Sequence, residues 1–381
     1  MKRTIIGLDL ENEYSQISYY SDRAGEPETV SIVENQDKYL IPTPEGLLRE
    51  RGKEKVRDLA EFIKACISYL RPVPDMTDIF LMITMREVRQ PWIGWLHDAC
   101  QMLGMDRENV FLQTYQESFF YYVLNQKKEL WNHDAALFEY TQSGIRSWMM
   151  KMDNRTRPAL VSVVPGEEIH LGSPAGRSEE EWNAVRDQKF LELIQSTFQE
   201  KIVSSTFLIG DSFDKTWAVE SLQYLCRKRH VFQGKNLYTK GACYAMCHKL
   251  HIGKNLDAWL YQSEDMTEYN ISMQMNIRGQ KTDYMLLSAG MNWYDAQNNC
   301  EILLDEGKEL VLYARSMRGG ETSSYTIVLK GLPERPVKTT RLRISLAYQS
   351  AKVCKVTVKD MGFGEFFPSS ELIWESMLNM E

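Results

Sequence analysis

Strands followed by helices occur twice along this chain, and this repeat constrains the fold more than any other feature. The first series opens with an apolar strand from Thr4 to Leu10 and a return strand from Gln16 to Ser21. The second series restarts with strands from Ala135 to Tyr140 and from Ile145 to Met152. Helices alternate with buried strands after each opening pair. The pattern predicts an α/β architecture with mixed sheets, arranged as two similar lobes.

The helices are predicted by apolar residues at helical spacing and by the signals at their ends. One amphipathic helix is expected from Lys55 to Arg71, and it stops before Pro72, as helices usually do. In the second series Ser178 and Glu181 form a capping box, in which hydroxyl and carboxylate satisfy free amides of a first helical turn. The two lobes are predicted to span residues 1–130 and 131–264.

The pattern changes from about Thr267 onward. Short strands follow one another at close spacing, as in the alternation of Leu342, Ile344 and Leu346, with glycines between them. Such strands with almost no helix signal are typical of a β-sandwich. We therefore expect a sandwich domain over residues 265–366 and a tail over 367–381. Glu371 to Met380 is the one stretch in this part that we expect to form a helix.

Composition excludes several classes of protein. A chain of 381 residues is too long for one compact core. A net charge of -7 argues against a nucleic-acid binder, which needs a basic surface. Apolar runs fall short of the roughly 20 residues that span a bilayer, so no membrane association is expected. Seven scattered cysteines without a Cys-x-x-Cys pair favour reduced thiols, and the expected location is cytoplasmic.

Five segments in collinear order resemble motifs of one superfamily. Asp9 to Glu13 is similar to a hairpin Asp-Leu-Gly-Thr-Thr, Glu139 to Gly144 to a loop Asp-Leu-Gly-Gly-Gly-Thr, and Gly210 to Asp214 to a loop Gly-Gly-Ser-Thr-Arg. Tyr238 to Ala245 resembles a Gly-Ala-Ala helix, and Leu329 to Pro333 a strand with its Gly-Ile-Pro turn. Together they resemble the actin-like ATPase superfamily, most closely the DnaK-type heat-shock chaperones. Each motif by itself is degenerate.

The resemblance implies a two-lobed actin-like, ribonuclease-H-like fold that binds nucleotide, followed by a peptide-binding β-domain. Asp9 and Glu139 would hold Mg²⁺ through water. Glu117 stands where the family has the carboxylate of a Glu-Pro-Thr helix opening, and in an active enzyme it would orient the attacking water. The positions that the resemblance assigns to nucleotide binding are Asp9, Glu11, Asn12, Glu139, Ser143, Gly144, Gly210 and Ser212.

The residues themselves argue against a working phosphate site. Glycine-rich turns grip phosphate because no side chain separates it from the backbone N–H groups. Glu11 and Glu13 instead bring negative charge to the place of the triphosphate. Each lost hydrogen bond to a charged group costs about 1.5–3 kcal/mol, so two or three losses would abolish useful affinity. Asp9, Glu117 and Glu139 are equally explained as polar residues that end strands or begin a helix.

We therefore predict a non-catalytic scaffold or protein-binding protein on a chaperone-like fold, with a polypeptide partner and without a cofactor. Two alternatives stay open. One is a weak Mg-dependent ATPase, using Mg-ATP or Mg-ADP, that couples lobe closure to the β-domain. The other is an actin-like protomer that assembles into oligomers or filaments.

Overall fold

The computed structural model describes residues 3–21, 23–31, 40–49, 55–199, 201–214 and 217–380. The chain divides into two compact units, Met1–Tyr261 and Gln262–Glu381. The finer division at residues 130 and 366 stays a prediction. No helix in the described ranges is both long and apolar enough to cross a membrane.

The first unit begins with a mixed sheet in which the strands lie in the order β3-β2-β1-β5-β6. β1 is antiparallel to β2 and parallel to β5, and β5 is parallel to β6. A short strand, β4, pairs with β2. The strands are β1 (Thr4–Asp9), β2 (Tyr14–Ser21), β3 (Glu26–Thr29), β4 (Ile41–Pro42), β5 (Ile79–Met85) and β6 (Val110–Thr114).

A second sheet in the same unit has the order β11-β10-β7-β8-β9-β12. β7 is antiparallel to β8 and parallel to β10, and β10 is parallel to β11. The strands are β7 (Asp134–Tyr140), β8 (Gly144–Asp153), β9 (Ala159–His170), β10 (Val203–Ile209), β11 (His230–Gly234) and β12 (Trp259–Gln262).

The two sheets share one topology. In each, the first strand pairs antiparallel with the second, the second with the third, and the first runs parallel to the fourth, which runs parallel to the fifth. This strand order is ribonuclease-H-like, and its repetition gives the first unit the actin-like architecture that the sequence resemblance implied. The ends of β1 and β7, with Asp9 and Glu139, are therefore equivalent positions in the two sheets.

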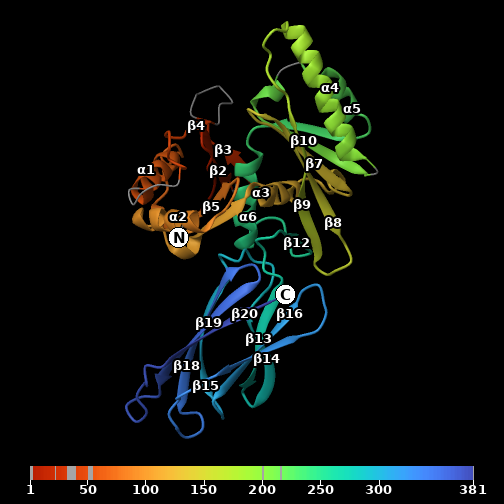
Figure 1. The fold of residues 1–381 in the computed structure, drawn as a ribbon. Helices are drawn as coiled ribbons and strands as arrows, with labels where there is room; N and C mark the ends of the chain where they lie inside the picture. The colour runs from red at the N-terminus through yellow and green to blue at the C-terminus, as the bar shows by residue number, and fades with distance from the viewer. Residues whose placement is uncertain are drawn as a thin grey trace. The chain divides into compact units, whose positions relative to one another are not determined.

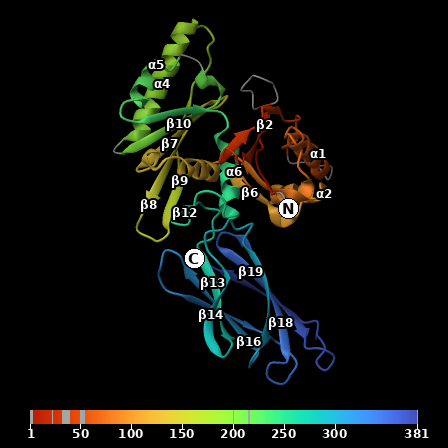
Figure 2. The ribbon, with the colours of Figure 1, turned by 180° about the vertical axis from the view of Figure 1, so that it is seen from behind.

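α-Helices pack against the two sheets, and Figures 1 and 2 show α3 and α6 between them. The helices are α1 (Lys55–Ile67), α2 (Gln90–Met102), α3 (Tyr115–Asn125), α4 (Glu179–Phe198), α5 (Val219–Leu225) and α6 (Leu237–Lys249). The capping box predicted at Ser178 and Glu181 is confirmed, with both hydrogen bonds formed. The sequence predicted a longer helix around α5, from Lys215 to Arg229, and its residues 215 and 216 lie outside the described ranges.

The helix α6 connects the two sheets. In sequence it lies between β11 and β12 of the second sheet, but its Ala242 and Met246 pack against Ile5 and Met82 of the first sheet. A Cβ atom on Gly241 would lie only 2.0 Å from the Ser118 carbonyl oxygen of α3, so the helices cross at backbone contact. Any larger side chain at this position would push the two helices apart.

The second unit is all-β. Its sheets have the strand orders β14-β13-β16-β17 and β15-β18-β19-β20, and side chains of both contribute to one apolar core. The strands are β13 (Tyr269–Ile277), β14 (Gln280–Leu287), β15 (Gln297–Leu304), β16 (Glu309–Ser316), β17 (Ser323–Val328), β18 (Thr340–Ser350), β19 (Val353–Gly362) and β20 (Ile373–Asn379). Figure 1 shows these strands in the blue-green to violet part of the chain.

The predicted helix from Glu371 to Met380 is wrong, because residues Ile373–Asn379 form β20 and pair antiparallel with β19. The segment alternates, with Leu378 buried and Ile373 and Met377 exposed, which suits a strand with one covered face. Its acidic groups pair with basic groups of β19 in the bonds Lys355–Glu375 (2.7 Å) and Lys359–Glu371 (2.9 Å).

Candidate functional site

A row of polar side chains crosses the first sheet where its strands end. The ladders place Gln16 and Thr84 directly opposite Asp9 on the two sides of β1, and Gln113 opposite Thr84. Residues in register on neighbouring strands point to the same face. All four are buried, although each has polar groups that need hydrogen-bond partners. This row, with Asp9 at its centre, forms one wall of the candidate site.

Tyr115, the first residue of α3, connects Asp9 to the hairpin after β1. Its hydroxyl lies 2.7 Å from Asp9 Oδ1 and 3.0 Å from Glu11 Oε2. A hydroxyl carries one proton and can donate to only one of these carboxylates at a time. The other carboxylate must offer a proton of its own or forgo a hydrogen bond.

Arg86, which follows β5, joins the ends of the two sheets. Its Nη1 and Nη2 donate to the two carboxylate oxygens of Glu139 at 3.1 and 3.2 Å. The same Nη2 lies 3.4 Å from Glu11 Oε2. Two-pronged pairing of this kind is the strongest geometry available to an arginine and a carboxylate. Glu139, which was predicted to hold a metal, and Glu11, which was predicted to lie beside phosphate, therefore both contact a cation of the chain itself.

Aromatic packing holds this arrangement in place. The ring of Tyr115 stacks on Tyr238 of α6, with centroids 4.0 Å apart and planes within 9° of parallel. The guanidinium carbon of Arg86 lies 5.3 Å from the centroid of the Tyr115 ring, within the range of a cation–π contact. The site is therefore filled by side chains of β5, α3 and α6, and these elements also fix the relation of the two sheets.

Burial sets the protonation of Asp9. Loss of hydration is the largest cause that raises the pKa of Asp9 to about 8. The charges of Glu11 and Glu139 act in the same direction, whereas the Tyr115 hydrogen bond and the charge of Arg86 act against the shift. For Glu11, burial raises the pKa, but the Asn12 N–H, Arg86 and Tyr115 outweigh it and lower the pKa. At neutral pH a protonated Asp9 can donate to the Tyr115 oxygen, which leaves the Tyr115 proton for ionised Glu11.

Mg²⁺ does not fit this set of groups. Both oxygens of Glu139 are bound to Arg86, and Asp9 Oδ1 lies 2.7 Å from the Tyr115 hydroxyl, so a metal ion would have to displace groups of the chain from both carboxylates. Among the described residues no cluster of three or more His, Cys, Asp or Glu side chains is suited to a metal ion. The expectation that Asp9 and Glu139 bind Mg²⁺ is therefore at odds with their contacts.

The turns after β1 and β7 touch each other. The Gln142 amide donates to the Glu13 carboxylate, although the two residues are far apart in sequence. Asn12 hydrogen-bonds to its neighbour Glu11. Ser143 and Gly144 form hydrogen bonds within their own turn. The Gly144 N–H donates to the Thr141 hydroxyl oxygen at 3.2 Å, and the Ser143 hydroxyl oxygen lies 3.0 Å from the same atom. The groups that the resemblance assigns to phosphate thus contact the protein itself.

Gly210 and Ser212 lie after β10, at the start of a short 3₁₀ turn. A Cβ atom on Gly210 would stand 2.5 Å from the Tyr140 carbonyl oxygen, and its φ of +112° favours glycine. The Ser212 carbonyl accepts a hydrogen bond from the Trp217 indole at 2.7 Å. Close packing against β7 explains this glycine without an adenosine.

Glu117 lies in the first turn of α3, where its backbone N–H is capped by the Thr114 hydroxyl at 3.4 Å. Its side chain is buried, and its charge helps raise the pKa of Tyr121, one turn further on. The structure brings Asp9, Glu11 and Glu139 together around Tyr115 and Arg86.

The space beside the cluster is small. A cavity of about 250 Å³ is lined by Glu11, Asn12, Arg86, Arg89 and Trp92, among others. This is below the roughly 300–1,000 Å³ of ordinary ligand pockets.

Sequence reasoning missed the residues that fill the site, namely Arg86, Tyr115 and Tyr238. Tyr115 immediately precedes the predicted helix opening at Gln116, and Tyr238 begins the segment that resembles the Gly-Ala-Ala helix. The sequence signal that could have identified Tyr115 and Tyr238 was their position at the start of these two helical segments.

Comparison with known families shows to which family the chain belongs. Residues 45–264, more than half of its length, match the family described as "Family of unknown function (DUF5716) C-terminal". The chain belongs to this family. Residues 266–380 match a second description, "Domain of unknown function (DUF8552)". No curated protein matches the chain.

Distant likenesses to solved structures cover about two thirds of the chain. They include an inorganic polyphosphate/ATP-glucomannokinase from Arthrobacter sp. strain KM, at 12% identity over 65% of this chain and 99% of that one, with a TM-score of 0.38. A glucokinase from an Antarctic psychrotroph matches at 10% over 65% and 99%, with a TM-score of 0.39. A Bacteroides thetaiotaomicron protein with an actin-like ATPase fold and unknown function matches at 9% over 64% and 96%, with a TM-score of 0.34. Likenesses this remote carry no argument about function.

Proposed function

We propose that this protein is a non-catalytic scaffold of actin-like architecture that binds a polypeptide partner. The observation that carries the proposal is Arg86, whose guanidinium occupies the space between Glu139 and Glu11. In this proposal the two sheets of the first unit are two lobes, and an internal cation takes the place of a metal and phosphate between them. The two lobes then have a structural role and do not bind nucleotide between them.

Energetics support this choice over a weak ATPase. A nucleotide would have to displace Arg86 from Glu139, leaving a carboxylate that is only 10% exposed without its partner. Breaking one half of such a pair typically costs about 3–5 kcal/mol. The incoming triphosphate would also meet the negative charges of Glu11 and Glu13. No observation favours the filament alternative over these two.

The polypeptide partner is assigned to the second unit, which in the proposal is a sandwich domain comparable to the β-domain of chaperones. Ten of the seventeen exposed large apolar side chains in the described ranges lie in this unit, although it makes up less than a third of the chain. Exposed apolar side chains concentrated in one region are typical of surfaces that contact other proteins.

Calorimetric titration with Mg-ATP and Mg-ADP tests the proposal for the first unit. We expect no binding heat and no change in melting temperature at millimolar nucleotide. A true binder would be stabilised by about 2.7 kcal/mol at about 100 times its Kd. A melting shift that Asp9→Ala removes would refute the non-catalytic proposal and favour the Mg-dependent ATPase.

A further inference from the structure

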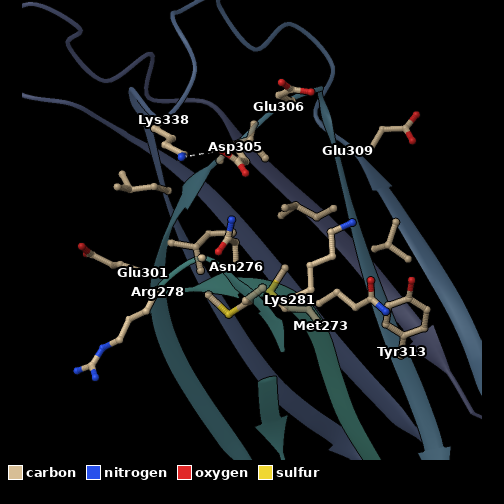
Figure 3. A pocket seen from close by; sticks show the side chains of 18 residues that line it. Met273, Asn276, Arg278, Lys281, Glu301, Asp305, Glu306, Glu309, Tyr313 and Lys338 are labelled. Carbon is tan, nitrogen blue, oxygen red and sulfur yellow. Dashed lines mark ion pairs between the residues drawn. The ribbon is translucent and has the colours of Figure 1, made fainter. Parts of the chain in front are cut away.

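A cavity of about 840 Å³ opens in the second unit where a sheet comes apart (Figure 3). β13 pairs with β14 from Ile271 to Ile277, but with β16 only from Tyr269 to Ser272. β16 pairs with β17 from Glu309 to Ala314. Each strand therefore has a stretch that is paired on one side only.

The cavity lies where the missing part of the ladder would be. If the register of β13 and β16 continued, Met275 would stand opposite Leu310 and Asn276 opposite Glu309. The cavity is lined by Met273–Asn276 on one side and by Glu309–Val311 on the other. We call this opening the β13–β16 wedge. Along its two walls run the edges of β13 and β16 that do not pair with each other.

The base of the wedge is apolar. Met273, Leu310 and Ile302 are each less than a tenth exposed and belong to the core of the unit, with Met275 and Leu304 packed against it. Ile302 and Leu304 come from β15, which lies in the other sheet. A guest in the wedge would thus lie against core residues that come from both sheets of this unit.

Charges of opposite sign lie on the two sides. Arg278 and Lys281 belong to the hairpin of β13 and β14, whereas Glu306 lies in the turn between β15 and β16 and Glu309 is the first residue of β16. Figure 3 shows Glu306 and Glu309 along the upper margin and Lys281 in the middle of the opening. Lys338 is paired with Asp305 at 3.6 Å on the remaining side. A guest with charges of both signs at its ends matches these walls.

We infer that the β13–β16 wedge is a docking site for an extended polypeptide segment of about five residues, with apolar side chains at alternate positions and charges of both signs at its ends. This inference rests on the proposed polypeptide-binding function and adds its location and mode. The guest inserts between two strands of a sheet. Since β13 and β16 are antiparallel, it runs antiparallel to one wall and parallel to the other, completing a mixed sheet.

Backbone chemistry selects this occupant. Unpaired N–H and C=O groups along a strand edge are best satisfied by another extended backbone. Alternate side chains of the guest would then point to the apolar base and to solvent, as in any strand that covers a core on one face. A small apolar molecule could fill the base but could not pair with both edges.

The test uses the full-length chain and a fluorescein-labelled octapeptide in which valine alternates with threonine between a terminal lysine and a terminal glutamate. A matched peptide carries N-methyl groups on alternate amides, which keeps the side chains and removes backbone donors. We expect fluorescence anisotropy to detect binding of the first peptide and about tenfold weaker or no binding of the second, a change equivalent to about 1.4 kcal/mol. Equal binding of both peptides, or binding of neither at millimolar concentration, would overturn the inference.

Two variants locate the site. Met275→Trp fills the wedge and should weaken peptide binding about tenfold. Met285→Trp makes the same change on β14 at an exposed position outside the lining, and it should leave binding unchanged. Circular dichroism and thermal melting check that both variants fold. Loss of binding in both variants, or in neither, would refute the wedge as the site.

Hydrogen–deuterium exchange separates the possible outcomes. Insertion should slow exchange in residues 273–277 and 309–312 together upon peptide addition. If protection appears only at an outer edge, such as β17 or β20, the protein binds polypeptide but the inference is wrong. If both stretches become protected as the protein alone is concentrated, the occupant is a second copy, and the partner assignment is wrong. Binding of no peptide contradicts the polypeptide proposal as well, whereas the nucleotide titration tests the first unit separately.

Discussion

The two sites of this protein differ in how their polar groups are satisfied. Between the sheets of the first unit, Arg86 and Tyr115 bind the carboxylates that a metal or nucleotide would otherwise contact. In the β13–β16 wedge of the second unit, the walls are strand edges that no other strand of the chain pairs within the described ranges. A site whose polar groups are bound by side chains of the same chain is suited to a structural role. A site whose strand edges are unpaired is suited to binding a partner.

The largest expected effect comes from removing the cation of the first site. Arg86→Ala leaves Glu139 buried and unpaired, and we expect a loss of about 2–4 kcal/mol in the free energy of unfolding, somewhat reduced because Arg86 is 37% exposed. Urea denaturation provides the measurement. The control Arg57→Ala removes an exposed pair with Glu61 and should cost less than about 1 kcal/mol. Equal effects of the two changes would show that the internal ion pair has no special role.

The pH dependence of the free energy of unfolding tests whether Asp9, in the first site, stays protonated in the folded chain. Because the folded pKa is about 8 and the unfolded value is 3.8, the folded chain keeps a proton that the unfolded chain loses. Stability should fall as the pH rises between these values, by up to about 1.4 kcal/mol per pH unit, and level off above pH 8. Asp9→Asn should remove this part of the slope between pH 5 and 8. Denaturation curves with parallel pH dependence for both proteins would contradict the assignment.

A smaller effect is expected for the hydroxyl that links Asp9 and Glu11. Tyr115→Phe keeps the stacking on Tyr238 and removes one donor from two carboxylates. We expect a loss of about 1–3 kcal/mol at neutral pH, since a buried group is left without its partner. The loss should shrink in the Asp9→Ala background, where only the contact between Tyr115 and Glu11 is left to remove, and a double-mutant cycle measures this coupling. Strict additivity would argue against the linked cluster.

The smallest effect is expected at the wall of the wedge. Met275→Ala truncates a side chain that already borders open space, so it should cost about 1 kcal/mol or less. Leu312→Ala, in the closed core on the neighbouring strand, should cost about 2–5 kcal/mol by denaturant unfolding. Similar costs at the two positions would mean that the wedge is closed in solution.

Local pattern was enough to predict much of the fold. The order of strands and helices in the first unit follows from apolar periodicity and capping, and the repeat of that order predicted two sheets of one topology. The pairing of Asp9 with Glu139 came from the family resemblance, and the structure places the two residues at equivalent ends of β1 and β7. The tail was mispredicted because its apolar residues suit a helix or a strand, and only the free edge of β19 decides between them.

By itself, the sequence determined that two carboxylates, Glu11 and Glu13, stand in the turn after β1, where the resemblance places a glycine and a threonine. Tertiary structure alone decided what those carboxylates bind, because Arg86 and Tyr115 are distant in sequence and come from different elements. It also decided where β13 and β16 separate, since alternation along a strand fixes which side chains face inward and carries no information about which neighbour pairs with it.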